Sequence, residues 1–182
     1  MQITQQADDL IQPFKQGKVF AYPTEAVYGL GCDPDNESAV KRLLEIKKRS
    51  IEKGLILIAS DFSQVKKYLK PLTESQQQFT QASDTTYIFP ALKSAPAWLT
   101  GDFDSLAIRI TKHPLAKELC ETLGSAVVST SANLSGLAPA KSVNEVIIQL
   151  NHKVDFIFEG KLGNANKPSV IRDSISEKVI RT

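Results

Sequence analysis

The amino-acid sequence predicts an α/β fold with a mixed sheet, on three observations. Short apolar segments that are typical of buried strands recur along the chain. Between most of them lie segments with apolar residues at three- and four-residue steps, which is the spacing of a helix. No internal repeat, low-complexity stretch or linker interrupts the 182 residues. We therefore expect one domain over residues 1–182.

The helices are predicted from apolar spacing and capping residues. Ile3, Leu10 and Phe14 share one face of a first helix, Asn36 would cap a second, and Pro114 would open a later one. The predicted helices cover residues 3–14, the segment after Asn36, a segment from about residue 61, residues 73–82, the segment after Pro114, and residues 142–150.

The strands are predicted where apolar, often β-branched or aromatic, residues lie between turn-forming ones. They cover residues 18–22, 55–59, 85–89, 106–110, 126–129, 154–158, 169–173 and 177–181. Residues 23–35 hold two prolines and two glycines and are expected to be irregular. Residues 90–104 are expected to form a long connection, and such connections are often functional.

The composition excludes several classes of protein. The 22 basic and 20 acidic residues nearly cancel, which excludes a histone-like polycation. Two cysteines are too few for a disulfide framework, and two histidines are too few for a zinc site. The longest apolar run, residues 55–59, is far shorter than a membrane span, and the first ten residues lack the pattern of a signal peptide. We expect a cytoplasmic protein that does not enter a membrane.

Common nucleotide-binding and hydrolase motifs are absent. The chain has no P-loop and no G-x-S-x-G elbow, and the pair Gly29 and Gly31 lacks the third glycine of a dinucleotide fingerprint. A nucleotide site would need another construction.

The densest positive charge lies in residues 41–53, where six basic residues meet two acidic ones. Lys47, Arg49 and Lys53 fall where a helix gives way to a strand, and three cations there could neutralise a polyphosphate. Equally, basic residues in a last helical turn can simply complement the helix dipole and face solvent. Spacing alone leaves both interpretations open.

Two further features are open to a binding or a structural interpretation. Residues 127–136 run from an apolar strand into short hydroxyl and amide side chains, which suit phosphate or carboxylate oxygens but also form turns. Arg109 lies inside an apolar strand and could hold a ligand carboxylate, or lie on a solvated face with Asp102 and Asp104 as partners. Thr24 follows the first strand and could line the same crevice, or belong to a proline turn.

Several segments, in order along essentially the whole chain, resemble the YrdC-like threonylcarbamoyl-AMP synthases. They are YPTEAVYGLG (22–31), the K-x-R of residues 47–49 followed by residues 53–55, SLAIR (105–109), STSANLSG (129–136) and PSVIRD (168–173). The length resembles the short, single-domain bacterial form of the family.

The resemblance implies a fold of the YrdC/RibB type, a twisted mixed sheet with surrounding helices and a deep, positively lined cavity. It implies a nucleotidyltransferase that joins L-threonine, bicarbonate and ATP, with Mg²⁺ accompanying the ATP, into L-threonylcarbamoyl-adenylate and diphosphate. Transferase proteins would then pass the threonylcarbamoyl group to tRNAs that read ANN codons.

The resemblance also implies roles for ten residues. The expected ATP-binding residues are Lys47, Arg49, Lys53, Ser105, Ser131, Asn133 and Ser169. The expected threonine-binding residues are Thr24, Arg109 and Ser129. No residue is expected to form a covalent intermediate or to bind a metal directly.

The chain departs from the family pattern in two loops. Relatives usually carry W-P-G-P-x-T before the strand that begins at Thr86, whereas this chain has Ala82, Ser83 and Asp84 in place of the Pro-Gly-Pro. Without these residues we expect a more flexible loop. Ser50 replaces the usual proline after the K-x-R. Both changes bear on catalytic efficiency and not on the fold.

Two other functions are compatible with the sequence. The basic segment could grip a phosphate backbone, which would make the protein a non-enzymatic RNA-binding module whose affinity falls steeply with salt. Alternatively, the enzyme could use ATP with another small amino acid.

Overall fold

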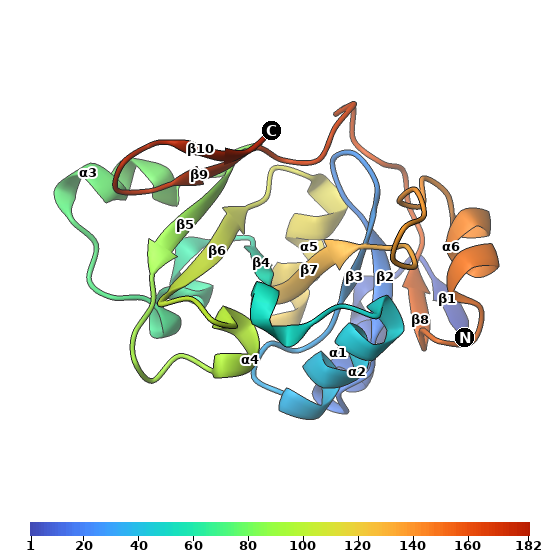
Figure 1. Cartoon of the computed structure of the whole chain (residues 1–182). Helices are drawn as coiled ribbons and strands as arrows, with labels where there is room; N and C mark the ends of the chain where they lie inside the picture. Colours follow the sequence, from blue (N-terminus) through green and yellow to red (C-terminus); the bar gives the residue numbers. More distant parts are fainter.

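Ten strands form one mixed, twisted sheet through the molecule (Figure 1). The computed structural model describes residues 1–182. From edge to edge the strands are ordered β1-β8-β2-β3-β7-β4-β6-β5-β9-β10. Their bounds are β1 Gln2–Thr4, β2 Phe20–Pro23, β3 Tyr28–Gly31, β4 Ile56–Ala59, β5 Thr86–Pro90, β6 Ser105–Ile110, β7 Val127–Ser131, β8 Phe156–Phe158, β9 Ile171–Asp173 and β10 Val179–Arg181. Parallel pairs such as β4 with β6 and antiparallel pairs such as β3 with β7 both occur, so the predicted fold class is confirmed.

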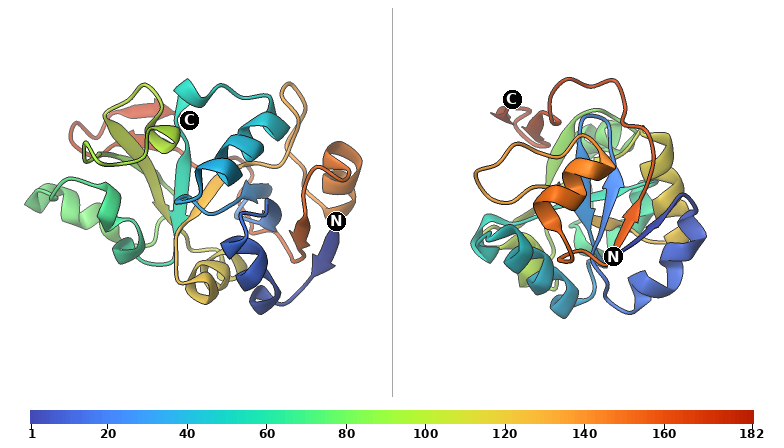
Figure 2. Two further views of the ribbon diagram at one scale, coloured as in Figure 1. Left: turned by 90° about the horizontal axis from the view of Figure 1, so that it is seen from below. Right: turned by 90° about the vertical axis from the view of Figure 1, so that its right-hand side faces the viewer.

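Helices cover both faces of this sheet. The α-helices are α1 Ile11–Lys15, α2 Glu37–Lys47, α3 Glu74–Gln77, α4 Ala97–Thr100, α5 Pro114–Leu123 and α6 Val143–Leu150. Short 3-10 helices are Ala7–Leu10, Ile51–Lys53, Phe62–Gln64, Lys66–Tyr68 and Gln78–Thr80. The right-hand view of Figure 2 shows α2 on one side of the central strands and α1 and α5 on the other.

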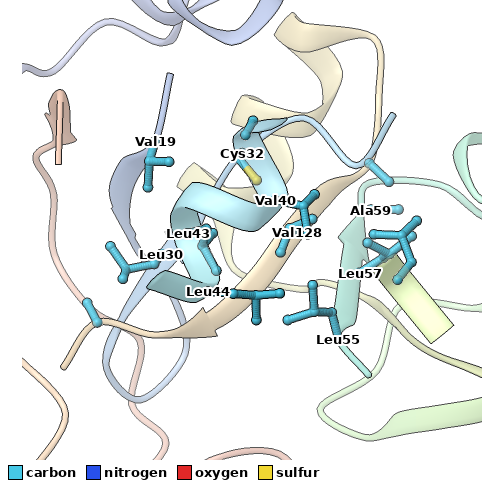
Figure 3. Close-up of a cluster of buried hydrophobic side chains, with 14 of the residues drawn as sticks. Val19, Leu30, Cys32, Val40, Leu43, Leu44, Leu55, Leu57, Ala59 and Val128 are labelled. Atoms are coloured by element: carbon cyan, nitrogen blue, oxygen red, sulfur yellow. The ribbon is translucent and has the colours of Figure 1, made fainter. Parts of the chain in front are cut away.

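The inner strands alternate their side chains between two apolar cores, because successive residues of a strand point to opposite faces. Leu57 and Val128 belong to a larger core that includes Val40 of α2 (Figure 3). Ile58 and Val127, the neighbours of these two strand residues, belong to a smaller core with residues of α1 and α5. The sheet is therefore held from both sides.

Helix α2 begins and ends where local chemistry dictates. The Asn36 side chain accepts a hydrogen bond of 3.0 Å from the amide of Ala39, which caps the helix as predicted. At the other end Lys48 takes a left-handed conformation, with φ of 49°, that closes the helix. The chain then turns toward β4, beside the central strands.

The prediction of an irregular segment over residues 23–35 was wrong at its centre, where β3 lies. Tyr28 and Leu30 of this strand alternate with Gly29 and Gly31, and because glycine is depleted in strands the sequence is typical of a loop. The lack of side chains at the two glycines is required, because an added Cβ would lie 3.0 Å and 2.9 Å, respectively, from ring atoms of Tyr22. The Tyr22 ring packs across these glycines and replaces the missing side chains.

Some predicted helices are shorter or differently formed. Ile3 belongs to β1, which pairs with β8, so the first helix starts only at the 3-10 turn Ala7–Leu10 and continues as α1. The segment from residue 61 forms two 3-10 turns, and α3 covers four residues of the predicted 73–82. The expected connection 90–104 contains α4. None of the helices has both the length and the apolar character of a membrane-spanning segment.

Candidate active site

A cavity of about 360 Å³ opens beside the central strands and contains most of the expected site residues. Its walls come from the β2–β3 turn, the end of α2, strands β4, β6 and β7, and the late segments around 165–170 and Arg181. Four basic and two acidic side chains line it. The lining residues are Thr24, Glu25, Ala26, Val27, Gly29, Arg49, Leu55, Ile56, Asp84, Arg109, Ser129, Thr130, Ser131, Pro139, Ala165, Lys167, Pro168, Ser169, Val170 and Arg181.

Six of the ten expected site residues line this cavity. They are Thr24, Arg49, Arg109, Ser129, Ser131 and Ser169. The other four, Lys47, Lys53, Ser105 and Asn133, are not part of its lining in this structure. The fold thus brings six of the residues that the sequence predicts to contact ATP or threonine, from segments far apart in the chain, to the wall of one cavity.

Strand β7 supplies three of the hydroxyl groups of the cavity wall, those of Ser129, Thr130 and Ser131. Ser129 pairs with Ile56 of β4, and Ser131 pairs with Gly29 of β3, so the end of β7 is fixed on both sides. Ser129 lies on the cavity wall although it is largely buried. Together these residues offer small polar groups that can donate to phosphate or carboxylate oxygens without steric bulk.

Arg109 and Glu25 form a buried ion pair on the cavity wall. The Arg109 Nη2 atom lies 3.1 Å from Glu25 Oε2, and the Thr111 hydroxyl donates to Glu25 Oε1 at 2.7 Å. Burial raises the pKa of Glu25, but the Arg109 charge and the Thr111 hydrogen bond outweigh it, so the pKa lies below its ordinary value. The proposed partners Asp102 and Asp104 were therefore wrong.

Arg49 and Arg181 line the same cavity from segments that lie far apart in the chain. Arg49 donates from Nη2 to the carbonyl of Gly54 at 3.0 Å, and Arg181 donates to the carbonyl of Ser169 at 3.3 Å. Burial lowers the pKa of Arg49, and the nearby positive charge of Arg181 lowers it further. The Arg49 Nε atom is buried without a hydrogen-bond partner. A polyanion would relieve the repulsion and could accept from this donor.

Lys47 lies behind the cavity and holds the turn that follows β7. Its Nζ atom donates to the carbonyls of Ser131 at 2.6 Å and Asn133 at 2.8 Å, and to Asn133 Oδ1 at 2.6 Å. The Ser131 hydroxyl also donates to Asn133 Oδ1, at 2.7 Å. All three N–H groups of an ammonium are thereby satisfied. Burial, and then the Arg49 charge, lower the pKa of Lys47 to about 8.

The remaining expected residues have other surroundings. Lys53 is exposed at the end of the 3-10 turn after α2, and Ser105 begins β6, paired with Pro90 of β5. Asn133 donates from Nδ2 to the carbonyl of Leu137 at 2.7 Å, which closes the turn held by Lys47.

The loop without Pro-Gly-Pro is tied to its surroundings by other contacts. The Ser83 amide donates to the carbonyl of Ile110 at 2.9 Å, and the Ser83 hydroxyl accepts from the amide of Thr85 at 3.0 Å. Asp84 lies on the cavity wall, 3.6 Å from the Lys112 ammonium. These contacts hold the loop at both its start and its end.

A segment from residue 159 to 170, which we call the crossing segment, joins β8 on one side of the sheet to β9 on the other. Figure 1 shows it passing above the tip of the β2–β3 hairpin. The amide of Gly163 donates to the carbonyl of Thr24 at 3.0 Å. A Cβ at Gly163 would lie 2.9 Å from the Cα of Glu25, so the close approach requires glycine. The crossing segment carries Lys167 and Ser169 into the cavity wall.

Sequence reasoning missed three polar residues of the cavity. Glu25 belongs to the segment 22–25, which could line the crevice or form a proline turn, but it has no expected role of its own, and neither have Lys167 and Arg181. No local pattern distinguishes a lysine or arginine on the crossing segment or on β10 from an ordinary surface cation. An acidic residue directly after Thr24 in the motif was the one available signal.

Acidic side chains in the cavity do not form a metal-binding cluster. No group of three or more His, Cys, Asp or Glu side chains that could hold a metal ion occurs in residues 1–182. Glu25 is engaged by Arg109, which leaves Asp84 as the cavity carboxylate that faces no arginine. These donors fit a metal that arrives with phosphate oxygens of its own better than one held by protein alone.

Comparisons with known proteins agree across nearly the whole chain. The Sua5/YciO/YrdC family model, described as telomere recombination, matches residues 12–182. A threonylcarbamoyl-AMP synthase of Enterobacter sp. (strain 638) is 50% identical over 176 residues, which cover 94% of this chain and 92% of the relative. One of Coxiella burnetii (strain RSA 493 / Nine Mile phase I) is 47% identical and covers 98% of this chain and 97% of the relative.

A solved structure has the same arrangement of elements. The crystal structure of P. abyssi Sua5 complexed with L-threonine superposes with a TM-score of 0.85 at 29% identity. The match covers 92% of this chain and 50% of that longer one.

Proposed function

Because the chain belongs to the Sua5/YciO/YrdC family, we propose that it is an L-threonylcarbamoyladenylate synthase, a nucleotidyltransferase that uses ATP. The observation that carries the proposal is the single cavity in which Arg49 and Arg181 lie with Arg109 and the hydroxyl groups of β7. This reaction needs cations that bind the ATP triphosphate close to an arginine that binds the threonine carboxylate.

The reaction joins two anions. The amine of L-threonine takes up CO₂ supplied by bicarbonate and becomes a carbamate. A carbamate oxygen then attacks the α-phosphorus of ATP, and the bond to the bridging oxygen breaks with release of diphosphate. Positive charge and exact placement of the reactants lower the barrier to such a step more than a covalent nucleophile would.

We assign the phosphate groups to the basic end of the cavity. Arg49 has an unpartnered buried Nε and lies beside Arg181, which supports the proposal that both would bind the triphosphate. Ser131 and Ser169 line the same cavity and would contact nucleotide oxygens, the Ser131 hydroxyl by exchanging the hydrogen bond that it donates to Asn133. Lys53, exposed four residues after Arg49, would reach an outer phosphate.

Lys47, Asn133 and Ser105 have less direct roles in this proposal. Lys47 and Asn133 shape the turn that presents the Ser131 hydroxyl, through the hydrogen bonds that Lys47 donates. Ser105 begins the strand that carries Arg109 near its other end, and its contact with nucleotide rests on the family resemblance.

The threonine would lie at the other end of the cavity. Arg109 would bind its carboxylate, and Ser129 would contact its polar groups. The Thr24 hydroxyl donates to the carbonyl of Val27 at 2.7 Å, so its oxygen remains available as an acceptor. Ala26, where many relatives have threonine, adds no polar contact on this wall.

The proposed reaction also involves a metal ion and partner proteins. Mg²⁺ would enter with the ATP phosphates, with Asp84 as a nearby oxygen donor, and would offset the charge of the leaving diphosphate. The product would pass to transferase proteins that modify tRNAs reading ANN codons, and these reactions would place the protein in the cytoplasm. Residues 1–182 would act as one domain.

The test is one incubation with ATP, Mg²⁺, bicarbonate and L-threonine, followed by mass spectrometry for the mixed anhydride and by diphosphate release. R49A and R109A are expected to reduce threonine-dependent diphosphate release at least about a hundredfold, since each removes a charged contact to the reacting anions. K41A, on the exposed surface of α2, is the matched control and should retain activity.

Two results would count against the proposal. Wild-type protein that binds RNA tightly at low salt, yet makes no adenylate, would favour the RNA-binding module. Greater turnover with another small amino acid would replace threonine as the substrate.

A further inference from the structure

Glu25 is a buried carboxylate on the cavity wall to which the proposed chemistry gives no role. Its side chain is 11% exposed and that of its partner Arg109 is 10% exposed. Oε1 accepts the Thr111 hydrogen bond, and Oε2 faces the guanidinium. A carboxylate in such a place is costly unless it compensates another charge.

Arg109 depends on this carboxylate for its placement. Within residues 1–182, Glu25 is its one ionic partner, and no hydrogen bond from the guanidinium to another residue is formed. The Arg109 Nε atom is buried and has no partner. One side of the guanidinium is thus anchored while other N–H groups remain for an incoming carboxylate.

The pair also joins parts of the fold that do not otherwise meet in the sheet. Glu25 lies in the turn between β2 and β3, whereas Arg109 lies on β6, and β7 and β4 separate these strands. Thr111 fixes the carboxylate, and the amide of Ala165 donates to the Glu25 carbonyl at 3.0 Å. Thr111 and Arg109 therefore set the position of the Glu25 side chain, while Ala165 holds its backbone.

We propose that Glu25 is a positioning residue for the amino-acid substrate: it aims the Arg109 guanidinium and keeps a negative charge on one side of it. A substrate carboxylate is repelled from that side and bound at the free N–H groups. The inference rests on the proposed assignment of Arg109 to the carboxylate of threonine. It goes beyond that assignment by giving the acidic residue of the Pro-Thr-Glu segment a function.

The test compares steady-state kinetics of E25Q with the wild type. Glutamine keeps the shape, and the backbone bond to Ala165 does not involve the side chain, so the main change is the lost charge. We expect KM for threonine to rise about tenfold or more, with KM for ATP and kcat changed less than about threefold. E25D, which restores the charge on a shorter side chain, should recover part of the loss.

Two controls separate positioning from general stability. D155N removes the carboxylate of the Arg42–Asp155 ion pair, which lies beside β8 near one edge of the sheet and away from Arg109 on β6. This variant should have a lower melting temperature and an unchanged KM for threonine. In the R109A background, E25Q should have no further effect on KM for threonine, because Glu25 acts through Arg109. If E25Q fails to fold, T111V tests the same support, with an expected rise of about two- to threefold.

The inference is overturned if E25Q raises the KM for ATP and threonine equally, leaves both unchanged, or adds its full effect to R109A. A wild-type enzyme that forms no threonylcarbamoyl-adenylate would instead refute the proposed function, so the two failures are distinguishable.

Discussion

Lys47 and Arg49 are two residues apart but serve different parts of the site. Helix α2 ends between them at Lys48, whose left-handed conformation turns the chain. As a result the Arg49 side chain reaches the cavity, whereas Lys47 stays against the turn after β7. The K-x-R spacing is visible in the sequence. The different positions of the Lys47 and Arg49 side chains could not be predicted, because they depend on the residue at which the helix ends.

Replacing Lys47 tests its role as a support. K47M keeps the length of the side chain but removes the three hydrogen bonds to Ser131 and Asn133. We expect a loss of kcat of at least about tenfold, because the turn after β7 that contains Ser131 and Asn133 is no longer held. Circular dichroism should show a retained fold, and retention of full activity would contradict the assignment.

The same variant predicts a difference in the pH dependence of stability. Since burial lowers the pKa of Lys47 to about 8, the unfolded chain binds more protons than the folded one between pH 8 and the ordinary lysine pKa. Wild-type stability should therefore rise relative to K47M over this window, by up to about 1.4 kcal/mol per pH unit. Urea denaturation at three pH values between 8 and 10 measures it, and parallel curves would argue against a titrating Lys47.

At the scale of elements, the helices and strands predicted from the sequence were most accurate where the apolar periodicity and the capping residues indicate the same boundaries. Helix α5 starts at Pro114 and is followed by Gly124 in a left-handed conformation; strand β4 is a continuous apolar run, and β6 is apolar apart from Ser105 and Arg109. The prediction failed at β3, whose glycines are there to admit Tyr22, and at the first residues, where Ile3 pairs with β8. In both places a tertiary contact decides the local structure.

The crossing segment is an element that can be tested through Gly163. G163A would place a Cβ 2.9 Å from the backbone of Glu25 and push the segment outward. Both KM values are expected to rise, because this segment carries Ser169 and Lys167 into the cavity. The matched control is G124A, which strains a left-handed C-cap of α5 but meets no atom within 4 Å. It should cost about 1 kcal/mol in urea denaturation with normal kinetics.

Across the whole molecule, the fold class and six of the polar cavity residues could be predicted, but the pairing of the cavity residues could not. The motif segments are far apart in sequence and meet only because the strand order brings β3, β7, β4 and β6 together. The partner of Arg109 is 84 positions earlier in the chain, and Arg181 lies beside Arg49 although the two are far apart in the sequence. Sequence spacing gives no access to such contacts.

ATP and threonine should each stabilise the folded protein, and different substitutions should abolish the two effects. A ligand at a hundred times its Kd adds about 2.7 kcal/mol to the unfolding free energy, or roughly 5–10 °C in Tm for a chain of this size. We expect R49A to lose the shift caused by Mg²⁺ and ATP while keeping that caused by threonine, and R109A to show the reverse. Thermal denaturation by differential scanning fluorimetry measures both, and equal loss of both shifts in either variant would contradict two separate subsites.

The walls of the cavity are drawn from residues 24 to 181, and this has a consequence for synthesis on the ribosome. A nascent chain that has not yet released β9 and β10 lacks the Ser169 and Arg181 wall, however well its earlier strands have paired. On the proposed assignment of the phosphates to Arg49 and Arg181, we expect an unfinished polypeptide to bind nucleotide only after its last strand has left the ribosome and paired.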